Sequence, residues 1–69
     1  QELIKTIQVF LDSQCEISET SRRLYIHRNT VKYRIEKAEE LLNCSFRDPA
    51  HSLRIRVALM IGIILKEKD

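Results

Sequence analysis

The chain has 69 residues, a formal net charge of +2, one glycine and one proline. A chain this short forms one domain at most and removes only about 60% of its unfolded surface from water, so we expect a partner subunit or neighbouring domain to add stability. The longest apolar run, 57–65, is far below the roughly 18 residues of a membrane span, and no signal peptide is recognisable. The sequence therefore predicts a single domain over 1–69 without a membrane partner.

The cysteines Cys15 and Cys44 are too widely spaced for a zinc or redox motif, and the histidines do not complete one. Free thiols in a reducing cytoplasm are the favoured interpretation, with a disulfide as the alternative. The chain also offers no paired nucleophile and base, no glycine-rich phosphate loop and little room for a catalytic pocket. We therefore expect a cytoplasmic domain that is not an enzyme and that holds no cofactor, metal or small molecule.

Apolar residues recur at helical spacing, which predicts a compact all-α domain of four to five helices. The first helix should cover 2–13, with one buried stripe along it. That stripe consists of Leu3, Ile7, Phe10 and Leu11. Ser18 is a good N-cap, because its hydroxyl can accept an unpaired amide proton, so we expect a second helix at 18–24.

A third helix is expected at about 28–42, after a link of three residues at 25–27. Its buried stripe is narrow and consists of Val31, Ile35, Ala38 and Leu42. In the link, we expect Tyr25 to pack and His27 to act as a cap or turn residue. Two short helices joined in this way are the layout of a helix-turn-helix, whose second helix offers its first turns to base edges in the major groove.

The fourth helix is expected to start at Asp48 and Pro49, an acidic cap and a first-turn proline, and to reach Lys66. Its second half is apolar on nearly every side. One stripe consists of Leu53, Val57, Met60, Ile61 and Ile64. The other side includes Ile55, Leu59 and Ile63. We assign this second set to an interface, because only another subunit or an absent domain can cover two apolar faces in a domain of this size.

The positive charge of the chain is concentrated around the third helix. Six Lys or Arg residues and one acid, Glu36, lie between Arg22 and Lys37. A localised basic block on a weakly charged chain is typical of polyanion binding. A basic helix face is nevertheless most often only a solvated face, so the residue types at each position decide the interpretation.

Helical geometry places the polar residues of the third helix opposite its apolar stripe. The expected base-reading residues are Arg28, Asn29, Thr30, Lys32 and Tyr33. Asn can pair bidentately with adenine, and Arg or Lys with guanine. The expected phosphate contacts are Ser18, Arg22, Arg23, Arg34 and Lys37. For Arg34, nearer the core edge, packing is the alternative role, and Ser18 lies at a helix end whose free amides suit a phosphate.

The segment SETSRRLYIHRNTVKYRIEKAEELL, followed by RDPAHSLRIRVALMI, resembles the C-terminal helix-turn-helix domain of PucR-type and sugar-diacid-type bacterial transcriptional regulators. Its HRNT element is also similar to the Fis-type helix-turn-helix. The resemblance covers roughly residues 3–65. It implies the C-terminal DNA-binding output domain of a longer, effector-responsive regulator that works as a homodimer or higher oligomer. It also implies DNA contacts at Arg28, Asn29, Thr30, Tyr33 and Arg34.

The chain departs from the family pattern in two places. Ser21 stands where Ala is usual, which is tolerable if the hydroxyl bonds back to its helix. Asn43 stands where Gly often closes the helix, and Asn can adopt the same left-handed cap. Neither departure touches the recognition helix, so sequence-specific binding of double-stranded DNA is the favoured function. The alternative is a helical interaction or dimerisation module that works through the apolar last helix and has no need of Asn29, Thr30 and Tyr33 opposite the core.

Overall fold

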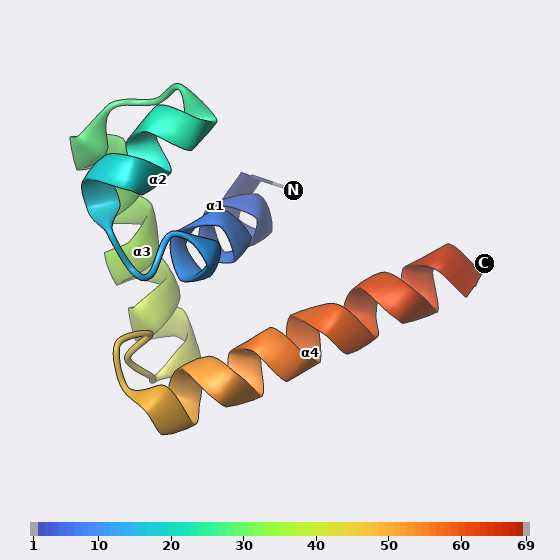
Figure 1. The fold of residues 1–69 in the computed structure, drawn as a ribbon. Coiled ribbons are helices and arrows are strands. Elements are labelled where there is room, and N and C mark those ends of the chain that lie inside the picture. Colours follow the sequence, from blue (N-terminus) through green and yellow to red (C-terminus); the bar gives the residue numbers. More distant parts are fainter. Residues whose placement is uncertain (1, 69) are drawn as a thin grey trace.

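The computed structural model describes the backbone of residues 2–68 and the side chains of residues 2–62. This part of the chain contains four helices and no strand, which confirms the all-α class (Figure 1). The helices are α1 (Glu2–Asp12), α2 (Ile17–Leu24), α3 (Arg28–Leu42) and α4 (Pro49–Lys68). Helix α1 packs against each of the other three, and α2 also packs against α3. Helix α4 runs away from the cluster that α1, α2 and α3 form, so part of its length projects from the body of the domain (Figure 1).

The core lies between α1 and α3 and is closed by an aromatic side chain from the loop before α4. Its buried apolar residues are Ile7, Phe10, Leu11, Val31, Ile35, Ala38 and Phe46. The rings of Phe10 and Phe46 meet edge to face with their centroids 6.2 Å apart, a favourable aromatic geometry. The stripes predicted for α1 and α3 are confirmed except at two ends: Leu3 is only partly buried and Leu42 is 53% exposed. Leu42 is exposed because it is the last residue of α3, beside a shallow recess rather than within the core.

Helix α2 begins one residue before the predicted cap. Its N-cap is Glu16, which has an extended backbone conformation and makes no capping bond through its side chain. Ser18 is already helical, so its hydroxyl cannot cap the helix and the predicted role was wrong. Instead, the buried hydroxyl of Thr20 donates to the Glu16 carbonyl at 2.7 Å. Ile17 packs against the core, which favours a helix that starts at this residue.

Two helices end on residues with left-handed backbone conformations. Asn43 closes α3 with φ 51°, as predicted for an Asn in place of Gly. Tyr25 closes α2 with φ 56°, and its side chain is 94% exposed. The expectation that Tyr25 packs was therefore wrong. Near the same end, Ser21 donates its hydroxyl proton to the Ser18 carbonyl at 2.9 Å. This is the hydrogen bond to its own helix that was expected to make Ser tolerable where Ala is usual.

Arginines from other segments hold the carboxyl end of α1. This helix has no basic residue in its last turn, although a cation there is favourable because the carbonyls carry partial negative charge. Arg56 of α4 donates to the Leu11 carbonyl at 2.8 Å. Arg47 donates to the Cys15 carbonyl at 3.0 Å and lies 5.5 Å above the centre of the Phe10 ring. These contacts fix the start of α4 against α1.

The start of α4 confirms the predicted cap, because the Asp48 carboxylate accepts a hydrogen bond from the Ala50 amide at 3.0 Å. The helix then continues to Lys68, two residues beyond the predicted end. Its apolar faces are reversed relative to the prediction. Ile55 and Leu59, assigned to an interface, pack against the core of their own domain. Leu53, Val57, Met60 and Ile61 are the exposed residues; the side chains of Ile63 and Ile64 lie outside the described residues.

Candidate nucleic-acid interface

The first turn of α3 is fixed by a side-chain cap. His27 is the N-cap, and its Nδ1 accepts a hydrogen bond from the Asn29 amide at 3.0 Å. This agrees with the expected capping role and leaves the next residues at the open end of the helix. Behind them, Val31 and Ile35 are buried in the core. The beginning of α3 is therefore held both at its end and along its rear side.

The predicted base-reading residues lie on the first two turns of α3. Arg28, Asn29, Lys32 and Tyr33 are exposed, and Thr30 is half-buried. Tyr33 shows 66% of its surface although it is a large aromatic residue. The structure thus brings together amide, guanidinium, ammonium and phenol groups on the side of α3 away from the core. Their contact with bases remains a prediction.

The predicted phosphate contacts divide into two groups. Arg22, Arg23 and Lys37 are exposed and Ser18 is half-buried, so all four side chains reach the surface. Arg34 instead reaches α1, where its guanidinium donates to the Glu2 carboxylate and the Thr6 hydroxyl, both at 3.3 Å. The Arg34 side chain is only 26% exposed. Packing, the alternative role for Arg34, is therefore the one that the structure shows.

Sequence reasoning missed a carboxylate that holds both arginines of α2. Glu19 accepts hydrogen bonds from Arg22 and from Arg23 Nε, the latter at 3.0 Å. These bonds, first from Arg22 and then from Arg23, hold the pKa of the Glu19 carboxyl below its usual value. The signal was present in the sequence, because Glu19 lies three and four residues before the two arginines, the spacing at which helical side chains meet.

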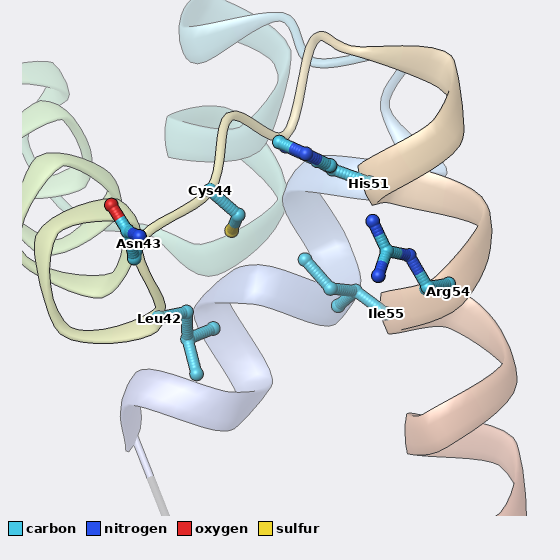
Figure 2. Close-up of a pocket in the computed structure, with 6 residues that line it drawn as sticks. All are labelled: Leu42, Asn43, Cys44, His51, Arg54 and Ile55. Carbon is cyan, nitrogen blue, oxygen red and sulfur yellow. The ribbon is translucent and has the colours of Figure 1, made fainter.

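A second group of polar side chains lies in a shallow recess of about 230 Å³ between the end of α3 and the start of α4. Figure 2 shows Cys44 on the loop and His51 and Arg54 on α4 around it. His51 Nδ1 accepts from the Ser45 amide at 3.0 Å. Burial, followed by the Glu39 charge, raises the pKa of the Cys44 thiol, and Arg54 opposes this shift. A raised pKa disfavours the thiolate, which is the nucleophilic form of a cysteine.

Both cysteines are free. Within the described residues, His, Cys, Asp and Glu form no group of three that could hold a metal ion. None of the helices in that part of the chain has both the length and the apolar character needed to cross a bilayer.

Proteins from several organisms match most of the chain. The purine catabolism regulatory protein of Bacillus subtilis (strain 168) is 56% identical over 59 residues, which are 86% of this chain and 11% of that protein. The proline-responsive transcriptional activator PutR of the same organism is 31% identical over 67 residues, 97% of this chain and 15% of the relative. An uncharacterised protein of Mycobacterium tuberculosis (strain ATCC 25618 / H37Rv) is 32% identical over 60 residues, which are 87% of this chain and 14% of that protein.

The chain thus spans only 11% to 15% of the length of these curated relatives. No solved structure is significantly similar to it. The sequence profile of the PucR C-terminal helix-turn-helix domain matches residues 3–61, which include α2, the turn and α3. The chain therefore belongs to the PucR C-terminal helix-turn-helix family, a family of DNA-binding regulatory domains.

Proposed function

We propose that this domain binds double-stranded DNA sequence-specifically, as the output domain of a longer bacterial transcriptional regulator, with α3 in the major groove. The observation that carries the proposal is the polar set on the first two turns of α3. Arg28, Asn29 and Lys32 are exposed there, while Val31 and Ile35 are buried behind them. A helix anchored along one side and polar on the other is suited to meet base edges.

Each base-reading residue has a chemical role in this proposal. The Asn29 amide pairs with N6 and N7 of an adenine, and Arg28 or Lys32 donates to O6 and N7 of a guanine. The Tyr33 hydroxyl is available to a base or a phosphate, and half-buried Thr30 offers a shorter reach. These contacts supply the preference for one sequence over another.

The backbone contacts come from α2 and from the middle of α3. Arg22, Arg23 and Lys37 are exposed and neutralise phosphates, with Ser18 close to the start of α2 as a further donor. Such contacts fix the orientation of the domain but carry no sequence information. We leave Arg34 out of this set, because its side chain is only 26% exposed and its guanidinium is hydrogen-bonded to α1.

A second candidate function, assembly with another protein surface, is supported by the exposed side of α4. Leu53 and Met60 are 64% and 62% exposed there, and contiguous apolar surface of this kind is typical of interfaces. A homodimer of the parent regulator would place two α3 helices about 34 Å apart, one turn of DNA. Met60→Glu is expected to lower the assembled mass in sedimentation experiments with the longer regulator. An unchanged mass would contradict the involvement of this side.

The DNA-binding proposal is tested by selection from a pool of random duplexes at several salt concentrations, followed by sequencing of the bound fraction. We expect one enriched motif and an affinity that falls steeply with salt. Asn29→Ala should weaken binding to the enriched site by about 1–3 kcal/mol and relax one base position. Glu40→Ala, an exposed substitution near the far end of the same helix, is the matched control. Equal losses on random DNA would contradict base reading by Asn29, and absence of any binding would refute the proposal.

A further inference from the structure

Glu19 lies where α2 would otherwise attract an anion. It belongs to the first turn of this helix, and the free amides and the dipole at a helix start favour negative charge. Its carboxylate also accepts from the two exposed arginines of the last turn, Arg22 and Arg23. Both arginines that α2 offers to a DNA phosphate are thus directed at one carboxylate of the same helix.

The two ion pairs are open to exchange. The side chains of Arg22 and Arg23 are 72% and 50% exposed, and that of Glu19 is 35% exposed. Exposed pairs of this kind are weak, because water screens both charges and the long side chains lose freedom when they pair. A phosphate can therefore replace the carboxylate at low cost, and it makes equally good bonds with guanidinium groups.

From this arrangement we propose that Glu19 is an internal competitor of the DNA backbone. In the free domain, it holds Arg22 and Arg23; on binding, a phosphate takes them over, and breaking the two ion pairs lowers the affinity for DNA. The inference rests on the proposed DNA-binding function. Its consequence is a lower affinity for all duplexes alike, because backbone contacts do not depend on sequence.

The test compares Glu19→Gln with the unmodified 69-residue chain by fluorescence anisotropy. The probes are one random-sequence duplex and one duplex enriched in the selection, each at several salt concentrations. We expect Glu19→Gln to bind both duplexes roughly two- to tenfold more tightly at low salt, the range set by two weak ion pairs that no longer have to break. The slope of log affinity against log salt should change little, because both proteins contact the same phosphates in the complex.

Glu16→Gln is the matched control. Glu16 is the exposed N-cap of the same helix and makes no capping bond through its side chain, so this variant removes the same charge without touching either arginine. In a second control, Glu19→Gln is added to an Arg22→Gln/Arg23→Gln background, where the gain should vanish. Circular dichroism of each variant verifies folding. Glu19→Asp keeps the negative charge on a side chain one methylene shorter, so its gain in DNA affinity should be intermediate.

The outcomes separate the two proposals. If the unmodified chain binds DNA but Glu19→Gln behaves like Glu16→Gln, or binds more weakly than the unmodified chain, competition by Glu19 is refuted and DNA binding is not. If a gain persists in the background without the two arginines, the carboxylate acts only by general repulsion and the proposed competition is also refuted. If no variant binds either duplex, the DNA-binding function itself fails, and the inference fails with it.

Discussion

Replacement of Arg34 by Met should lower stability and leave the salt dependence of DNA binding unchanged. The substitution removes an ion pair with Glu2, whose side chain is 85% exposed, and pairs of this kind contribute about 0.2–1 kcal/mol. It also removes a 3.3 Å hydrogen bond to the buried Thr6 hydroxyl, worth about 0.5–1.5 kcal/mol. Thr6 is not left unpaired, because its hydroxyl still donates to the Glu2 carbonyl at 2.8 Å. The expected total is therefore about 1–2 kcal/mol.

Urea unfolding followed by circular dichroism measures the stability, and anisotropy titrations at several salt concentrations measure the slope. Lys37→Met is the control, because Lys37 is exposed on the same helix and should show the reverse pattern: little change in stability and a slope shallower by about 0.9. If Arg34→Met reduced the slope by a similar amount while the free energy of unfolding stayed constant, Arg34 would be a phosphate contact and its bond to α1 would be incidental.

Three other substitutions test single features of the fold. Among the described residues, the buried Ser13 hydroxyl has no hydrogen-bond partner, so Ser13→Ala should raise the free energy of unfolding by about 1 kcal/mol; a loss of that size in urea unfolding would contradict this. Tyr25 has a left-handed backbone, which glycine adopts without strain, and an exposed side chain. Tyr25→Gly should therefore raise the free energy of unfolding by about 0.5–1 kcal/mol, and a lower thermal midpoint would refute the argument. Arg22 and Arg23 lower the pKa of the Glu19 carboxyl. The two ion pairs therefore stabilise the fold fully at pH values above the usual Glu pKa, and this stabilisation is lost as the pH falls through the lowered pKa. The stability difference between Glu19→Gln and the unmodified chain should therefore vanish at acid pH, and a constant difference would argue against the pairs.

Features that depend on a few neighbouring residues were predicted from the sequence. The limits of α3, its cap at His27 and its left-handed end at Asn43 all follow from local chemistry that the structure retains. The same holds for Asp48 at the start of α4. In each case the partner of the free backbone groups is local. The side chains of His27 and Asp48 accept from amides two residues further on, and backbone amides close α3 at Asn43.

Features that depend on which surfaces meet were not predicted. Phe46 lies in a polar loop, and only the approach of α1 makes it a core residue. The two apolar sides of α4 are alike in composition, so composition alone did not show that Ile55 and Leu59 lie on the inner side. Ser18 has the better capping chemistry, but the helix starts at Ile17, whose side chain is packed against the core. In each case tertiary contacts override a local preference.

The geometry of the candidate interface depends on a helix that carries none of its residues. Helix α1 packs against α2, α3 and α4, and it is joined to α3 through Arg34 and to α4 through Arg56. The angle at which α3 leaves the domain is thus set by α1, while the residues proposed to read bases only point outward from it. Because displacements of about 1 Å can break bidentate contacts to bases, substitutions on the inner side of α1 should impair base reading as strongly as substitutions on α3 itself. Sequence preference in this domain would then depend on residues that never touch DNA.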